Sequence, residues 1–402
     1  MRYTKDEIIQ YISEEDVKFI RLAFCDVFGV QKNIAIMPEE LPRAFEYGIA
    51  IDASAIRGFG DVVNSDLLLH PDPDTLAELA WRPETGKVVR MYADITYPDG
   101  TPFECDTRTL LKQAIKTAEL QGYTFAFGEE QEFYLFKLDD IDNRTYEPYD
   151  NAGYMDIAPE DRGENIRREI CLTLEKMGIH PERSHHEEGP GQNEIDFRYS
   201  DPLTAADNAL TFQMVVKTIA RRNGLYADFS PKPLKEAPGN GCHINVSVKP
   251  SDNFMNLNYM IAGILDKIQE MTLFFNPKDE SYSRFGGNKA PRYISWSAEN
   301  RSQLIRIPAA QGEYCRAELR SPDNLANPYL SFALLIHAGL YGINNRLALP
   351  DPVNENLQNA DPEIIRNLRK LPETLKEAAS LANSSSFVKS LIPQSIIDTY
   401  SK

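Results

Sequence analysis

Paired glutamates in a predicted strand are the first sign of chemistry in this sequence. Glu130 and Glu132 stand two residues apart in the run Phe127–Phe133 (FGEEQEF), within a longer stretch that alternates like a strand. Side chains at positions i and i+2 of a strand share a face, so the two carboxylates point the same way. Neighbouring carboxylates repel each other unless a cation lies between them. The pair therefore suggests a cation site, although a solvated acidic face is the simpler explanation for this pair alone.

Three further segments carry side chains of the same kind. The run Ser184–Phe197 (SHHEEGPGQNEIDF) holds Glu187 and Glu194, Gly239–His243 (GNGCH) ends in His243, and Arg316–Arg320 (RAELR) holds Glu318. Five carboxylates and one imidazole suit Mg²⁺ or Mn²⁺ better than zinc, because hard divalent ions prefer oxygen ligands. Six ligands can divide into two sites of three.

Four arginines lie within the last of these segments or shortly before it. Arg301, Arg306, Arg316 and Arg320 lie between Trp296 and Arg320, in a segment whose apolar residues predict burial. Guanidinium groups bind phosphate and carboxylate oxygens, and two divalent ions beside several arginines are typical of phosphoryl transfer. A surface salt-bridge ladder is the alternative for the arginines alone. All four segments in one chain make a merely solvated face improbable.

Composition and charge exclude several other classes of function. The chain has 402 residues with 43 Lys and Arg against 60 Asp and Glu, a formal charge of −17. That surplus argues against a nucleic-acid partner and against docking on an anionic membrane. Five cysteines without a C-x-x-C pair indicate reduced thiols and predict a cytoplasmic protein. The longest apolar stretch, Leu330–Ile343, is too short to span a bilayer and predicts a buried helix.

The elements that must position these residues are of mixed type. Alternating segments at Val17–Phe24 and Lys32–Met37 predict a hairpin, and the turn-rich Asp94–Cys105 predicts a domain boundary. After it, amphipathic helices alternate with short strands; one such helix carries Ile166, Ile170 and Leu174 on one face. Interleaved helices and antiparallel strands predict the α+β class.

At this point the sequence resembles the glutamine synthetase family, most closely its prokaryotic type I. The motifs that carry the resemblance are FGEEQEF, SHHEEGPGQNEIDF, G-x-x-x-H, WSAENRSQLIRIP, RAELRSPD and NPYL. The resemblance implies an amino-terminal β-grasp domain over residues 1–103. It also implies a catalytic domain over residues 104–402, built on an antiparallel sheet flanked by helices. It further implies a hexameric ring or a dodecamer with active sites between subunits. The implied reaction makes glutamine from glutamate, ATP and ammonia through a γ-glutamyl phosphate.

The same resemblance implies roles for individual residues. Glu132, Glu194 and Glu318 match ligands of a metal that holds the reacting carboxylate of glutamate. Glu130, Glu187 and His243 match ligands of a metal on the ATP phosphates. Arg301 and Arg320 match arginines that neutralise the transferring phosphoryl group. The matches on the nucleotide side are Ser247, Arg301, Arg306 and Arg316, and those on the glutamate side are Gly239, Arg284 and Arg320. Asp52 matches an ammonium site in a neighbouring subunit.

One departure from the family pattern keeps two alternatives open. Lys289 stands where the family has a glutamate that closes the site over ammonium, and a cation there would repel NH₄⁺. The departure motivates a γ-glutamyl ligase that uses an amine other than ammonia. A catalytically silent ring is the third interpretation, against which the intact metal and phosphate positions argue.

Overall fold

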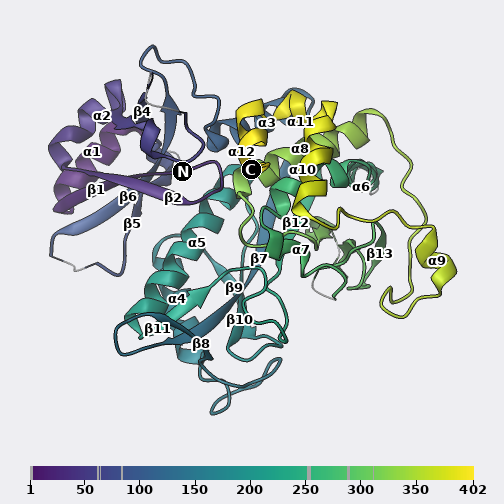
Figure 1. Cartoon of the computed structure of the whole chain (residues 1–402). Helices are drawn as coiled ribbons and strands as arrows, with labels where there is room; N and C mark the ends of the chain where they lie inside the picture. The colour runs from purple at the N-terminus through teal and green to yellow at the C-terminus, as the bar shows by residue number, and fades with distance from the viewer. Residues whose placement is uncertain are drawn as a thin grey trace.

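Two β-sheets with helices around them make up the molecule (Figure 1). The computed structural model describes residues 3–60, 63, 65–82, 85–250, 255–287, 290–310 and 312–402. Figure 1 shows the first sheet with α1 and α2 on the left, β8–β11 with α4 and α5 below, and the carboxyl-terminal helices at the upper right.

The amino-terminal sheet has the strand order β2-β1-β6-β4-β3, with β5 paired to β6. The predicted hairpin is confirmed, because β1 and β2 pair antiparallel with Ile20 opposite Ile36. β1 and β6 run parallel, which makes this a mixed sheet. Its elements are α1 (Lys5–Glu14), β1 (Val17–Cys25), β2 (Gln31–Ile36), α2 (Leu41–Tyr47), β3 (Ile49–Asp52), β4 (Asp66–Pro71), β5 (Ala77–Glu78) and β6 (Lys87–Thr96).

The larger sheet has the order β13-β14-β15-β12-β7-β10-β9, and β8 and β11 also pair with β7. All of its pairings are antiparallel except the pairing of β13 with β14. Its strands are β7 (Thr124–Leu138), β8 (Arg144–Pro148), β9 (Pro181–His186), β10 (Gln192–Phe197), β11 (Leu225–Asp228), β12 (Cys242–Lys249), β13 (Trp296–Ala298), β14 (Ile305–Ile307) and β15 (Ala317–Leu319). The α+β class is therefore confirmed.

Helices cover the larger sheet and one another. α3 and α5 pack on β7, α6 packs on β12, and α8 packs against all three of these helices. The helices are α3 (Thr107–Leu120), α4 (Glu164–Lys176), α5 (Pro202–Arg222), α6 (Met255–Phe275), α7 (Asp279–Tyr282), α8 (Pro328–Asn344), α9 (Pro362–Arg366), α10 (Leu375–Ser384), α11 (Ser386–Leu391) and α12 (Gln394–Tyr400). Among the described residues, no helix combines the length and apolar character needed to cross a membrane.

α8 is the buried helix predicted from Leu330–Ile343, and it crosses α6 at glycines. A Cβ added to Gly342 would lie 2.0 Å from the Tyr259 carbonyl oxygen, and one added to Gly263 would lie 2.1 Å from that of Ala338. Real side chains never approach backbone that closely, so only glycine permits this crossing.

One continuous hydrophobic core joins the two sheets. It runs from Ile8 in α1 to Tyr400 in α12 and includes residues of β1, β6, β7 and β12. Tyr400 connects the two ends of the chain directly: its hydroxyl donates to the Val27 carbonyl at 2.8 Å, and its ring stacks on Phe28 at 4.6 Å. A smaller core lies beneath α4 and α5 and contains Phe133, Ile170 and Phe212.

Candidate active site

Strand β7 lies between β12 and β10, and this position gathers the carboxylates. Glu130 lies opposite His243 of β12 on one side and Asp196 of β10 on the other. Glu132 lies opposite Glu194 of β10. Residues directly opposite in an antiparallel pair have close Cβ atoms, so the register alone places these acidic side chains together.

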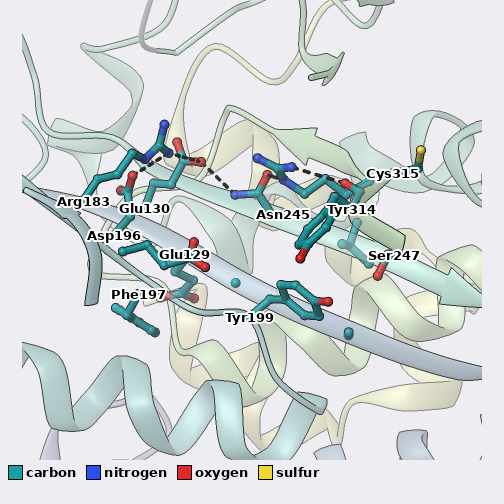
Figure 2. Close-up of a pocket in the computed structure, with 15 residues that line it drawn as sticks. Glu129, Glu130, Arg183, Asp196, Phe197, Tyr199, Asn245, Ser247, Tyr314 and Cys315 are labelled. Atoms are coloured by element: carbon teal, nitrogen blue, oxygen red, sulfur yellow. Dashed lines mark hydrogen bonds and ion pairs between the residues drawn. The ribbon is translucent and has the colours of Figure 1, made fainter. Parts of the chain in front are cut away.

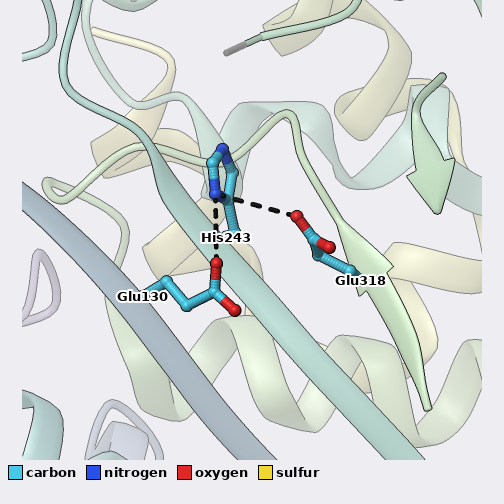
Figure 3. A group of neighbouring side chains, drawn as sticks. All are labelled: Glu130, His243 and Glu318. Carbon is cyan, nitrogen blue, oxygen red and sulfur yellow. Dashed lines mark ion pairs between the residues drawn. The ribbon is translucent and has the colours of Figure 1, made fainter. Parts of the chain in front are cut away.

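The first cluster consists of Glu130, His243 and Glu318, whose ligand atoms all lie within 4.8 Å of one another. Figure 3 shows the imidazole between the two carboxylates, with Nδ1 of His243 3.6 Å from Glu130 and 3.8 Å from Glu318. Burial alone would raise the pKa of Glu130, but hydrogen bonds and charge from His243, together with the Asn245 amide, hold it well below its usual range. The Glu130 carboxylate is therefore ionised.

The second cluster consists of His185, Glu187 and Glu194, also within 4.8 Å of one another. Glu132 lies beside it, and its Oε2 accepts from the Gly241 backbone N–H at 3.0 Å and from the Gln192 amide at 3.1 Å. Burial first, and then the charge of Glu132, raise the pKa of Glu194 well above its usual value. The surrounding protein groups therefore supply too little positive charge to neutralise these buried carboxylates.

Both clusters fit a hard divalent ion. Their donor atoms are carboxylate oxygens with one imidazole each, which is the chemistry that suits Mg²⁺ or Mn²⁺. The raised pKa of Glu194 is the second sign of fit, because a bound cation would remove the repulsion that raises it.

Two arginines contact Glu318 of the first cluster. Arg306 of β14 and Arg320, which follows β15, each form an ion pair with Glu318. Arg320 is buried, and its Nε donates to the Arg301 carbonyl at 3.1 Å. Arg301 itself is exposed. Arg306 and Arg320 therefore place positive charge next to Glu318.

Arg284 and Gly239 lie together at the end of β12 nearest the second cluster. Arg284 is buried, donates to the carbonyls of Asn240 at 3.1 Å and Ser321 at 2.7 Å, and lies 3.6 Å from Asp323. A Cβ on Gly239 would lie 2.9 Å from the Arg284 side chain. Arg284 therefore fixes the loop that carries Gly239, and glycine is needed there for close packing.

A pocket opens beside Glu130, which lines it together with Asp196 (Figure 2). It leaves about 620 Å³ empty and is open to solvent. Figure 2 shows a chain of contacts across it: Arg316 donates to Asn245 at 2.8 Å, and Asn245 donates to Glu130 at 2.9 Å. Ser247, Tyr199 and Tyr314 line the same pocket. The pocket thus combines aromatic rings and a cation with a carboxylate of the first cluster.

Comparison with known proteins decides the family. The model of the glutamine synthetase catalytic domain matches residues 104–402, and the model of the glutamine synthetase beta-grasp domain matches residues 16–98. The chain belongs to the glutamine synthetase family. The family uses ATP and a divalent metal, which agrees with the two clusters and the pocket.

Relatives and solved structures agree over nearly the whole chain. Glutamine synthetase of Methanosarcina mazei is 46 % identical and the match covers 99 % of this chain and 92 % of the relative. Glutamine synthetase of Staphylococcus aureus is 42 % identical, with 99 % and 93 % covered. A GmaS/ADP complex matches with a TM-score of 0.88 at 26 % identity, covering 98 % of this chain and 93 % of that one. A Plasmodium falciparum glutamine synthetase structure shares the fold with a TM-score of 0.86 at 22 % identity, covering 100 % and 95 %.

The grouping of the ligands differs from the one that the resemblance implied. Glu318 was expected with Glu132 and Glu194, yet it lies with Glu130 and His243; Glu187 was expected with Glu130, yet it lies with Glu194. The pairing of the strands explains both differences. β15 pairs with β12, which carries His243, whereas Glu187 directly follows β9, which pairs with β10.

The predicted nucleotide residues separate in space. Ser247 and Arg316 line the pocket, while Arg306 contacts Glu318 and Arg301 contacts Arg320 through its backbone. Two of the four therefore lie around the pocket, and two lie at the first cluster. Lys289, on which the alternative acceptor depended, lies outside the described residues.

Asp52 lies in the other sheet, at the end of β3. It is exposed, and its Oδ1 accepts from the backbone N–H and the hydroxyl of Ser54 at 2.9 and 2.6 Å. These hydrogen bonds lower its pKa, so the carboxylate is ionised. Within the part of the chain that the structure describes, Asp52 belongs to neither cluster and does not line the pocket.

Four contributors were missing from the sequence-based set of ligands and pocket residues. His185 belongs to the second cluster, Asp196 lies opposite Glu130, Asn245 connects Glu130 to Arg316, and Arg183 pairs with Asp196 at 2.6 Å. Strand alternation could have found His185, which lies two residues before Glu187, and Asp196, which shares a face with Glu194. Nothing in the sequence pattern marks Arg183, which lies on the neighbouring strand β9.

Proposed function

We propose that this chain makes glutamine from glutamate and ammonia at the expense of ATP. The observation that carries the proposal is the pair of adjoining carboxylate clusters on β7, with Glu130 lining a pocket on one side and arginines around Glu318. Relatives named glutamine synthetase at 42–46 % identity over the whole chain support it. They do not favour the alternative of a different amine.

The two clusters suggest two metal sites with separate tasks. Glu130, His243 and Glu318 would hold Mg²⁺ or Mn²⁺ beside the nucleotide pocket, which Glu130 lines. Glu187 and Glu194, with Glu132 and His185 beside them, would hold a second ion near Gly239. Such ions supply positive charge to phosphate and carboxylate oxygens and stabilise the charge that develops on them.

The arginines act on the phosphoryl group in the first step. An oxygen of the glutamate γ-carboxylate attacks the γ-phosphorus of ATP, and the bond to the leaving ADP breaks. Arg320 and Arg306 lie at Glu318, and Arg301 adjoins Arg320, so their guanidinium groups are placed to neutralise the transferring oxygens. Ser247 and Arg316 hold the nucleotide in the pocket.

Ammonia completes the reaction in the second step. An ionised Asp52 from a neighbouring subunit of the hexameric ring or dodecamer binds ammonium and accepts one of its protons, which produces ammonia. The ammonia nitrogen then attacks the carbonyl carbon of the γ-glutamyl phosphate, phosphate leaves, and a second proton passes from the new amide nitrogen to the leaving phosphate or to water. Gly239 and Arg284, which pack against each other, form part of the binding site for glutamate.

We also propose that the two domains divide near residue 103, as 1–103 and 104–402. β6 ends at Thr96 and α3 begins at Thr107, so no strand or helix crosses that point. The shared core explains why the two parts pack as one body.

The experiment compares acceptors directly. Purified protein is incubated with ATP, glutamate and Mg²⁺ or Mn²⁺, with ammonium or one of a panel of primary amines, and phosphate and the γ-glutamyl product are measured. We expect phosphate release that depends on ammonium and matches glutamine formation one to one. A stronger response to a primary amine would make the chain a γ-glutamyl–amine ligase, and no turnover with any acceptor would make it a silent ring.

A further inference from the structure

A second buried network lies behind the second cluster. Asp150, in the loop after β8, accepts through Oδ1 from the Gly191 backbone N–H at 3.0 Å and contacts His186 Nε2 at 2.9 Å. Its Oδ2 accepts from the Arg162 backbone N–H at 3.0 Å. The side chains of His186 and Asp150 are 0 % and 2 % exposed, so neither reaches the pocket or a substrate.

The other nitrogen of His186 holds the backbone of Glu187. Nδ1 lies 2.7 Å from the Glu187 carbonyl oxygen, which can only accept. Nε2 faces a carboxylate, so both ring nitrogens donate. The ring is therefore fixed between Asp150 and Glu187.

These contacts restrain one residue of the second cluster, Glu187. His185 and Glu187 belong to the second cluster, and His186 between them points to the opposite side, toward Asp150. The Glu187 N–H donates to Gln192 at 2.8 Å, so both backbone groups of Glu187 are held. Asp150 also holds Gly191, and the turn between β9 and β10 is thus fixed at both ends by one carboxylate.

This network is not a further metal site. Asp161 also lies within 4.8 Å of Asp150 and His186. Arg167 donates to both carboxylate oxygens of Asp161, at 3.1 and 2.5 Å. Arg167 and His186 therefore supply the positive charge that a cation would otherwise provide.

We propose that Asp150 and His186 are positioning residues that hold the Glu187 carboxylate in place for the metal at the second cluster. The inference rests on the two-metal site of the proposed function and adds a residue pair that does not touch the reacting atoms. Partners that orient metal ligands typically change metal affinity by about 10–100-fold when they are removed.

The test is Mn²⁺ binding to the full chain, measured by electron paramagnetic resonance of free Mn²⁺ and by calorimetry, without substrates. Asp150→Asn keeps the size of the side chain and one acceptor oxygen. The amide nitrogen that replaces one oxygen cannot accept a hydrogen bond, so this variant loses either the contacts of Oδ1 with Gly191 and His186 or the contact of Oδ2 with the Arg162 N–H. We expect one class of Mn²⁺ sites to weaken about 10-fold and the other to change less than twofold. Asp150→Ala should weaken the same class further, and if it does not fold, the Asn variant decides alone.

Asp106→Asn is the matched control. Asp106 is equally buried and also accepts from two backbone N–H groups, those of Ile95 and Arg108, but it lies at the start of α3. Its substitution should leave both classes of sites unchanged. Unaltered Mn²⁺ binding in Asp150→Asn, or equal weakening of both classes, would overturn the inference. Because binding is measured without turnover, a failure to make glutamine would contradict the proposed function and leave this result standing.

Discussion

At the scale of single residues, the buried carboxylates on β7 repel their neighbours, although the proposed function needs them together. Glu132 is fully buried opposite Glu194, and its charge contributes to the raised pKa of that residue. Natural active sites often keep such unfavourable groups because a ligand or an ion relieves them. We therefore expect the repulsion between Glu132 and Glu194 to lower the free energy of unfolding of the protein without metal.

The substitution Glu132→Gln separates these two effects. The amide oxygen can still accept from Gly241, so the fold should persist, while one negative charge disappears beside Glu194. We expect glutamine formation to fall at least about 100-fold and the melting temperature in EDTA to rise. Activity assays and thermal unfolding in EDTA check both parts.

Asp228→Asn provides the comparison for that variant. Asp228 is a buried carboxylate on β11, which also pairs with β7, but it pairs with Arg144 at 2.8 Å, away from both clusters. Its substitution should lower stability and leave activity within about threefold. Full activity in Glu132→Gln would remove Glu132 from the metal site.

Most of the residues that the structure brings together were predicted from the sequence, but the grouping implied by the resemblance differs from the one in the structure. Alternation within β7 placed Glu130 and Glu132 on one face, because that depends only on the period of a strand. The partners of Glu318 and Glu187 depend on which distant strands pair, and alternation carries no information about strand order. The hairpin of β1 and β2 and the buried helix α8 were predictable for the same reason: both are local patterns.

At the scale of elements, the crossing of α6 and α8 depends on glycine. Gly342 leaves no room for a Cβ against the Tyr259 carbonyl, whereas a Cβ on Gly339 would meet only side chains of Met260 and Phe125, at 2.8 and 3.1 Å. Side chains can move aside more easily than a helix backbone. We expect Gly342→Ala to reduce the free energy of unfolding by about 3 kcal/mol or more, and Gly339→Ala by less than half of that. Denaturant unfolding of the two variants measures the difference, and equal losses would contradict this account of the crossing.

The same helix carries a histidine whose titration opposes folding. Burial lowers the pKa of His337 from 6.5 to about 4, so the folded chain prefers the neutral ring. Above pH 6.5 the ring is neutral in both the folded and the unfolded chain, so it does not reduce stability. As the pH falls from 6.5 toward 4, only the unfolded chain takes up the proton, and the free energy of unfolding decreases by up to about 3 kcal/mol. Glutamine does not titrate, so the free energy of unfolding of His337→Gln should rise relative to that of the parent as the pH is lowered from 7 to 4. Unfolding curves at both pH values test this, and a constant difference would argue against a buried neutral ring.

At the scale of the whole molecule, the separation of Asp52 from the clusters predicts shared active sites. Asp52 lies in the amino-terminal sheet, and Glu132 lies in the larger sheet. If each site takes Asp52 from a neighbour, inactive Asp52→Ala and Glu132→Gln subunits should complement each other in mixed assemblies. A random equal mixture restores about a quarter of the interfaces, because only one ordered pair in four is intact. Co-expressed subunits with two different tags allow the activity of mixed assemblies to be measured.

The two homogeneous variants, each purified alone, are the controls for this complementation. Both should remain inactive before and after mixing without subunit exchange. Mixed assemblies that stay inactive would place Asp52 at the site of its own chain, or outside catalysis.

The stacking of Tyr400 on Phe28 has a consequence for the order in which the protein is made. The two contacting segments are 373 residues apart, and Phe28 lies in the turn between β1 and β2. A growing chain presents its first sheet early, since folding during synthesis proceeds from the amino terminus. Arg57 can cover one part of the Phe28 ring early, but the contact with Tyr400 forms only after residue 400 has been synthesised. The packing of the amino-terminal sheet is therefore completed by α12, long after the sheet itself has been made.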